Sequence, residues 1–171
     1  MSLVVVDIES DGPCPEIYSM VCFGAVVVDT NLDKTFYGET SPIGSKYISE
    51  ALAVSGFSRT EHKAFDHPSE TMPKFFEWVS RINRPVFISD NNGFDWQWIN
   101  YYFHRFCSGN PFGFSSRRIS DVYSGLVGDM GKGTEWKKFR KTKHTHNPVD
   151  DAMGNAQALL KISEMGVKGI I

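Results

Sequence analysis

The order of apolar and polar blocks along the chain predicts a run of strands first, and alternating strands and helices later. Runs rich in β-branched residues predict strands over 3–9, 20–28, 34–39, 85–89 and 117–120. Apolar residues at helical spacing predict helices over 49–55, 68–82, 94–106 and 148–165, and a further helix starting near 121. This order predicts an α/β domain with a mixed sheet, in which three initial antiparallel strands are followed by alternating strands and helices.

Local signals refine two of these regions. Ser69 is the predicted N-cap of the helix over 68–82, because a short hydroxyl side chain can accept a bond from the first free backbone N–H groups. The segment 40–68 is rich in Gly, Ser and Pro. We interpret it as loops around the one short helix at 49–55.

Length and composition narrow the class of protein. With 171 residues, of which 41% are hydrophobic and 22% charged, the chain is expected to form one domain, residues 1–171. Three cysteines without a Cys-x-x-Cys pair argue against a disulfide framework or a cysteine zinc site, and they fit a reducing cytoplasm. The sequence has neither a membrane-length apolar run, which needs roughly 20 residues, nor a signal-peptide pattern. We therefore expect a cytoplasmic protein that makes no contact with a membrane.

The opening strand ends in two carboxylates. Side chains alternate along a strand, so Asp7 and Glu9 project from the same face. Two carboxylates at the end of an apolar strand repel each other unless a cation lies between them, and Mg²⁺ prefers such oxygen ligands. The alternative is an ordinary strand end with two solvated acids.

A third carboxylate lies on an apolar helical face. At about 100° per residue, Asp95 shares its stripe with the core-forming residues Ile99, Tyr102 and Phe106. A solvated acid is not expected on that face. Asp95 is therefore a candidate for a functional site.

The start of the last helix adds a fourth carboxylate and a histidine. Asn147 is the predicted N-cap, with Pro148 at the first helical position. Asp150 can satisfy the helix dipole in the first turn, which leaves Asp151 free for another role. His146 precedes Asp151 by five positions and is a candidate base, although a single histidine in a polar loop is more often solvated.

These residues form three motifs whose order and spacing resemble the 3′–5′ exonuclease superfamily named DEDDh for its four acidic residues and a histidine. The motifs are Asp7-Ile-Glu9, Asn91-Asn-Gly-Phe94-Asp95 and His146-Asn-Pro-Val-Asp-Asp151-Ala152. The superfamily includes the proofreading subunit of DNA polymerase, ribonuclease T and oligoribonuclease. Ser10 replaces a common Thr and Asp90 a common His, but neither change removes a residue that the family uses in chemistry. The phrases Phe-Gly-Ala-Val-Val-Val and Ser-Gly-Phe-Ser-x-x-Glu, with the short length, look most like the small bacterial and phage exoribonuclease branch.

The resemblance implies an RNase H-like fold and a two-metal mechanism. Two Mg²⁺ ions, with Mn²⁺ as a substitute, are expected about 3.5–4 Å apart. The implied ligands are Asp7, Glu9, Asp95 and Asp151, with Asp7 bridging both ions. His146 is the implied general base, and its ordinary pKa of about 6.5 suits that role.

Candidate substrate contacts lie in the basic stretch before His146 and on the aromatic helix. Positive charge and aromatic rings interleave there, as in loops that hold phosphates and stack bases. The candidates are Trp136, Lys138, Arg140, Lys143 and Trp96. The alternative for the basic stretch is a solvated loop with no ligand.

The function that the resemblance implies is a metal-dependent 3′–5′ exonuclease that releases 5′-monophosphates. RNA is favoured over DNA as the substrate, either single-stranded or with a 3′ overhang. A DNA-directed exonuclease is the first alternative, and a non-catalytic nucleic-acid-binding module is the second. Relatives are often dimers, so a homodimer is also considered.

Overall fold

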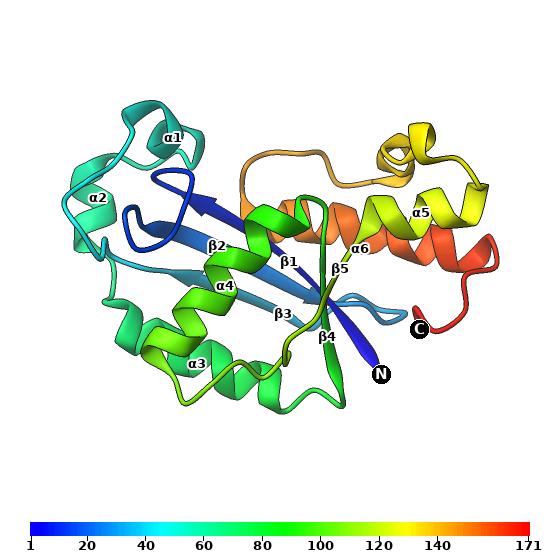
Figure 1. The fold of residues 1–171 in the computed structure, drawn as a ribbon, viewed down its shortest axis with the longest axis horizontal. Coiled ribbons are helices and arrows are strands. Elements are labelled where there is room, and N and C mark those ends of the chain that lie inside the picture. The colour runs from blue at the N-terminus through cyan, green and yellow to red at the C-terminus, as the bar shows by residue number, and fades with distance from the viewer.

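A computed structural model describes residues 1–171 and is built on a five-stranded sheet with the strand order β3-β2-β1-β4-β5 (Figure 1). The strands are β1 (Ser2–Ser10), β2 (Met20–Val27), β3 (Thr35–Glu39), β4 (Pro85–Ser89) and β5 (Ser116–Arg118). β1, β2 and β3 are antiparallel neighbours, whereas β4 pairs parallel with β1 and β5 parallel with β4. The predicted mixed sheet is confirmed.

Helices cover both faces of the sheet, so that β1 is buried on each side. Val4, Val6 and Ile8 pack into a core with α3 (Pro68–Ser80) and α4 (Asn92–Phe106). Leu3 and Val5 point the other way, into a core with α5 (Ile119–Val127) and α6 (Pro148–Glu164). Figure 1 shows α4 crossing one face while α6 runs behind the strands. None of the helices combines the length and the apolar character that a bilayer span requires.

The segment 40–68 contains two helices where one was expected. They are α1 (Ser49–Val54) and α2 (Arg59–Ala64). The second helix begins with a capping box, in which the Ser58 side chain accepts from the Glu61 N–H and the Glu61 carboxylate accepts from the Ser58 N–H. The Ser-x-x-Glu spacing of this box is visible in the sequence and indicates a helix start at Ser58. The interpretation with a single helix overlooked this signal and was wrong.

Among the boundaries that differ from the prediction, two concern the starts of helices. The N-cap of α3 is His67, whose ring nitrogen accepts from the Ser69 N–H, so Ser69 is inside the helix. α5 begins directly after β5 with no intervening loop, two residues before Asp121. Two 3₁₀ turns, η1 (Met130–Lys132) and η2 (Glu135–Phe139), follow α5 within the basic stretch.

A buried ion pair fixes the chain just beyond β1. Asp11 has no exposed surface, and its Oδ2 lies 2.6 Å from Nη1 of Arg59 on α2. Asp11 Oδ1 accepts from the Ser19 N–H at 2.5 Å. His62 lies beside the pair, and burial lowers the pKa of its imidazole to about 4, so the ring is neutral and adds no charge. This network holds the segment after Glu9 against α2.

Gly24 in β2 allows the first turn of α6 to lie directly on the sheet. A Cβ at this position would lie 2.4 Å from the Val149 nitrogen and 2.6 Å from the Pro148 carbonyl oxygen. Both atoms are backbone, so they cannot rotate away. Glycine in the Phe-Gly-Ala phrase therefore sets the height of α6 above β1 and β2.

We expect Gly24→Ala to destabilise the protein by about 1–3 kcal/mol, the usual cost of inserting a methyl group into a full space. Urea denaturation monitored by circular dichroism measures the change. Gly125→Ala is the matched control, because Gly125 lies within α5 with open space around its Cβ position. That control should be neutral or stabilising by up to about 1 kcal/mol. A Gly24→Ala variant as stable as the wild type would contradict the close approach.

Candidate active site

Four carboxylates gather at the end of the sheet where β1 and β4 finish. Asp7 and Glu9 come from β1 and project on the α6 side, since they alternate in phase with Leu3 and Val5. Asp151 comes from the first turn of α6. Asp95 comes from the first turn of α4, which follows β4 on the opposite face. The four residues are up to 144 positions apart in the chain. The parallel pairing of β1 with β4 and the packing of α6 on β1 and β2 bring their elements to one edge of the sheet.

Three of the carboxylates lie close enough to share one ion. Single oxygens of Asp7, Glu9 and Asp151 all lie within 4.8 Å of one another. Asp151 is only 1% exposed and Asp95 only 3%. Asp95 is outside the group of three, but its charge acts on Asp7 strongly enough to raise the pKa of that side chain.

Burial and mutual repulsion shift the pKa values of this cluster upward. Loss of solvent is the main cause for Asp7, followed by the charges of Asp95, Asp151 and Glu9, and the pKa rises well above its ordinary value. Burial also raises the pKa of Asp95 to about 8. The pKa of Glu9 rises for the same reason, although the neighbouring His146 imidazole opposes the shift. A site that resists its own ionisation in this way favours a bound cation.

The donors present fit hard divalent cations. Oδ2 of Asp95 is buried without any hydrogen-bond partner, which is costly unless a ligand occupies that side. All four side chains offer carboxylate oxygens, the donors that Mg²⁺ and Mn²⁺ prefer. Asp7, Glu9 and Asp151 offer oxygens that lie close enough together to ligate one such ion, and the unpartnered Oδ2 of Asp95 is a further available oxygen.

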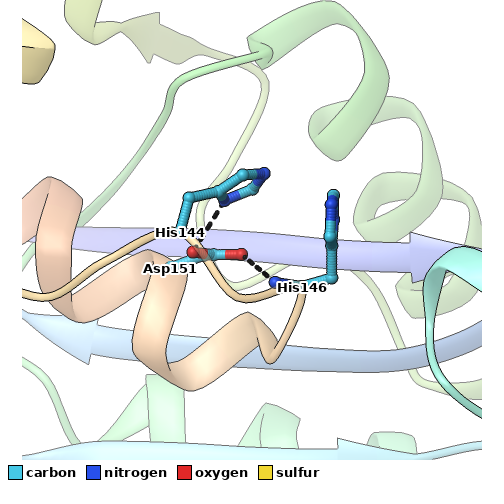
Figure 2. A group of neighbouring side chains, drawn as sticks. All are labelled: His144, His146 and Asp151. Atoms are coloured by element: carbon cyan, nitrogen blue, oxygen red, sulfur yellow. Dashed lines mark hydrogen bonds and ion pairs between the residues drawn. The ribbon is translucent and has the colours of Figure 1, made fainter.

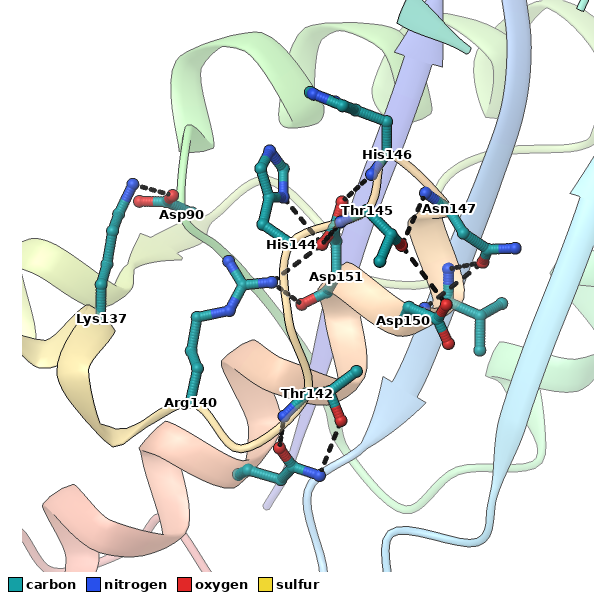
Figure 3. A network of polar contacts seen from close by, with 12 residues as sticks. Asp90, Lys137, Arg140, Thr142, His144, Thr145, His146, Asn147, Asp150 and Asp151 are labelled. Atoms are coloured by element: carbon teal, nitrogen blue, oxygen red, sulfur yellow. Dashed lines mark hydrogen bonds and ion pairs between the residues drawn. The ribbon is translucent and has the colours of Figure 1, made fainter. Parts of the chain in front are cut away.

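Asp151 also organises the loop before α6. Its Oδ1 accepts from Arg140 Nη2 at 2.8 Å and from the Thr145 N–H at 3.1 Å, and its Oδ2 accepts from the His146 N–H at 2.9 Å (Figure 3). Nδ1 of His144 lies 2.7 Å from Oδ1 (Figure 2). His146 has a left-handed φ of 61°, which non-glycine residues rarely adopt. The segment is thus wrapped around one carboxylate.

The wrapped loop points His146 at the acidic cluster. Its Nδ1 lies 3.3 Å from Glu9 Oε1, and the side chain is 48% exposed. An imidazole held beside buried carboxylates and open to solvent can take up a proton from an attacking water. The five residues of the DEDDh pattern are therefore assembled in one place.

The structure places Trp136 differently from the sequence-based expectation. Trp136 is fully buried in the core with α6, and its indole N–H donates to Ser120 Oγ at 3.1 Å. In a 3₁₀ turn, residues three apart share a face, so Trp136 and Phe139 face the core together. Trp136 is thus not available to stack on a base. Lys138, on the outer side of the same turn, is exposed and pairs with Glu135 at 3.2 Å.

Arg140 also differs from the expectation of an exposed contact. Its side chain is 11% exposed and faces Asp151 instead of solvent. Gly154 makes room for it, because a Cβ there would lie 2.6 Å from Arg140 Nε. Lys143 is exposed and lines a basic hollow of about 390 Å³ beside the carboxylates. The hollow is lined by Asp90, Lys137, Arg140, Lys141, Thr142, Lys143 and His144.

Asp90, which replaces a common histidine of the family motif, anchors this hollow to the β4–α4 turn. Its Oδ2 lies 2.6 Å from Lys137 Nζ (Figure 3). Trp96, the remaining predicted contact, is half-buried with its ring edge-on to Phe87 at 5.1 Å. Sequence reasoning missed His144, although its position two residues before His146 was a visible signal.

A second, mostly apolar hollow of about 380 Å³ borders Glu9. It is lined by Glu9, Ser10, Gly12, Pro13, Ile48, Ala51, Val54 and Phe94. Its walls come from β1, the loop after it, α1 and α4, and Glu9 forms one edge. Sequence reasoning missed the α1 side of this hollow, because nothing local connects residues 48–54 with β1.

The chain is similar to a known exonuclease in sequence and to several solved structures in fold. No protein-family model matches the chain. The 3′–5′ DNA exonuclease Cap18 of Escherichia coli is 32% identical over 175 residues, covering 96% of this chain and 93% of Cap18. The crystal structure of cell-death related nuclease 4 (CRN-4) matches with a TM-score of 0.78 at 16% identity over 98% of this chain. That of E. coli exonuclease I in complex with a dA16 oligonucleotide matches with a TM-score of 0.77 at 14% identity over 96% of this chain. The chain spans 65% of CRN-4 and 41% of exonuclease I.

We expect the stability of the metal-free protein to fall as the pH rises from about 6 to about 9. Asp95 has a pKa of about 8 in the folded state, against an ordinary 3.8. Between these two pH values only the folded state holds the proton. A raised carboxyl pKa contributes stability at low pH, which is lost as the pH passes through the folded value. The free energy of unfolding should fall by on the order of 2 kcal/mol, measured by urea denaturation in EDTA.

Two comparisons isolate the carboxylates in that experiment. Asp95→Asn should reduce the pH dependence, because an amide does not titrate, and the part that remains comes from Asp7 and Glu9, whose pKa values are also raised. Added Mg²⁺ should restore most of the lost stability at the higher pH, because the cation favours the ionised carboxylates. Stability that increases with pH in the metal-free wild type would contradict the raised pKa values.

Proposed function

Because the chain belongs to the DEDDh family of 3′–5′ exonucleases, we propose that it acts as a single domain that removes nucleotides from the 3′ end of DNA. The products are nucleoside 5′-monophosphates. One observation carries the proposal: carboxylates from β1, α4 and α6 converge at one edge of the sheet, with His146 beside Glu9. Buried carboxylates of this kind are otherwise destabilising, which favours a catalytic reason for their presence.

Each side chain has a separate task in this proposal. Asp7, Glu9 and Asp151 would hold one Mg²⁺ or Mn²⁺ ion, and Asp95 would help to hold a second. When bound, such ions would supply positive charge that lowers the pKa of the attacking water and offsets charge on the scissile phosphate. His146 accepts the proton of that water at its imidazole and passes it to solvent through its exposed side.

The two hollows fit opposite parts of a nucleotide chain. The apolar hollow beside Glu9 has the size and lining to hold the 3′-terminal base between Ile48 and Phe94. The basic hollow, lined by the Asp151 partners Arg140 and His144, offers Lys137, Lys141 and Lys143 to backbone phosphates. Single-stranded or overhanging 3′ ends are the expected substrates, since an unpaired base enters the apolar hollow without melting a duplex.

DNA is proposed as the polymer because Cap18, the 32% identical relative, is named a DNA exonuclease. RNA is the second candidate, since the Phe-Gly-Ala-Val-Val-Val and Ser-Gly-Phe-Ser-x-x-Glu phrases resemble the exoribonuclease branch. Discrimination between the two needs a contact to the 2′-hydroxyl.

Matched 5′-labelled DNA and RNA strands test the polymer and the direction together. With Mg²⁺ we expect stepwise shortening from the 3′ end, release of 5′-monophosphates and faster cleavage of DNA. Faster cleavage of RNA would reassign the polymer. Tight binding to both strands without cleavage in Mg²⁺ or Mn²⁺ would indicate a non-catalytic binding module.

Asp7→Ala and Asp151→Ala should each reduce cleavage to background while the fold is kept. Each removes a ligand of the ion that activates water. Asp150→Ala is the matched control, because the neighbouring Asp150 is exposed and only accepts from the Thr145 hydroxyl at 3.3 Å. That variant should keep activity within a few-fold. Full activity of either test variant would exclude the proposed metal centre.

His146→Ala should slow turnover by about 10²-fold or more, the usual cost of losing a general base. Metal binding, measured by calorimetry with Ca²⁺, should be unchanged, because the proposed ligands are all carboxylates. Turnover equal to that of the wild type would remove His146 from the proton-transfer role.

A further inference from the structure

Asp151 belongs to two different clusters of potential metal ligands. The first is the all-oxygen group with Asp7 and Glu9. The second consists of His144, His146 and Asp151, whose donor atoms also lie within 4.8 Å of one another (Figure 2). The two groups differ in chemistry, because one offers only oxygens and the other offers two imidazole nitrogens and one oxygen.

The geometry of the second cluster allows it to close around an ion. His144 Nδ1 already lies 2.7 Å from Asp151 Oδ1, and the two imidazole rings are 4.4 Å apart between centroids. The side chains of His144 and His146 are 55% and 48% exposed, so both rings can rotate. Zinc bond lengths of about 2.0–2.2 Å place tetrahedral ligands roughly 3.4 Å apart. Small rotations of two exposed rings are sufficient to reach that spacing.

The anchoring carboxylate has a free coordination position. Oδ1 of Asp151 is shared by Arg140, Thr145 and His144, whereas Oδ2 accepts only the His146 N–H. An ion that binds Oδ2 leaves the contact between Oδ1 and Arg140 intact, and the exposed His144 ring then rotates from Oδ1 toward the ion. The nearby guanidinium weakens cation binding, which makes this an exchangeable site and not a structural one.

We propose that His144, His146 and Asp151 form a zinc site that inhibits the enzyme. Two imidazoles and a carboxylate select Zn²⁺ over Mg²⁺. Mg²⁺ prefers oxygen ligands and is expected to bind the all-oxygen group of Asp7, Glu9 and Asp151 instead. A zinc ion there occupies the lone pair of the His146 nitrogen that accepts the proton. It also competes with Mg²⁺ for Asp151. His144, which the DEDDh pattern does not include, is the residue that creates the site.

Calorimetric titration with Zn²⁺ and, separately, with Ca²⁺ tests the binding directly. His144→Ala should weaken Zn²⁺ binding by at least about tenfold while Ca²⁺ binding stays within about twofold of the wild type. The matched control is His104→Ala, which removes an exposed histidine in the last turn of α4. That variant should bind both ions as the wild type does.

Two outcomes of the titration would overturn the proposal. Zn²⁺ affinity unchanged in His144→Ala would show that the imidazole is not a ligand. An equal loss of Zn²⁺ and Ca²⁺ affinity would show that His144 merely supports Asp151. Circular dichroism of both variants checks the fold, which an exposed side chain at position 144 is not expected to affect.

The proposal that zinc inhibits the enzyme rests on the proposed nuclease function, and it is tested separately from zinc binding. In assays with saturating Mg²⁺, the Zn²⁺ concentration that halves the rate should rise by at least about tenfold in His144→Ala and stay unchanged in His104→Ala. Equal sensitivity of His144→Ala and the wild type to Zn²⁺ would overturn the inhibitory role. A protein that binds Zn²⁺ through His144 but cleaves nothing would instead contradict the nuclease function and leave the binding site intact.

Discussion

The repulsion among four carboxylates in a place with little water is the constraint on which this structure depends. Asp7 and Asp95 both have raised pKa values, and burial is the main cause for each. The fold lowers the free-energy cost of burying these charges by placing Asp95 and Asp151 in the first turns of α4 and α6, where the helix dipoles favour negative charge. The repulsion that the helix dipoles do not offset favours the binding of divalent cations.

Asp151 links this electrostatic problem to the shape of the surrounding chain. It accepts backbone N–H groups from Thr145 and His146 on its two different oxygens, so the carboxylate proposed as a metal ligand also shapes the loop. The left-handed conformation of His146 is kept because that carboxylate holds it there. The proposed base and the proposed metal ligand are thereby coupled. Anything that moves α6, including a side chain at Gly24, moves both.

Much of the site could be predicted from the sequence, because its residues stand at the ends of elements with clear patterns. β1, α4 and α6 have strong apolar periodicity, and the acidic positions follow from their registers. The burial of Trp136 could not be predicted from charge, because its basic neighbours suggested an exposed loop; the three-residue spacing to Phe139 was the relevant signal. The contact of Gly24 with Pro148 spans most of the chain and has no local signature. The orientation of Arg140 toward Asp151 depends on the same long-range packing of α6.

The central claim is that carboxylates from three elements form a single divalent-metal centre. Anomalous diffraction from crystals soaked in Mn²⁺ tests it most directly, because the signal locates the ions independently of activity. The account predicts one peak coordinated by Asp7, Glu9 and Asp151, and a second between Asp7 and Asp95. Absence of both peaks at a Mn²⁺ concentration that stabilises the protein, or peaks only outside this cluster, would contradict it.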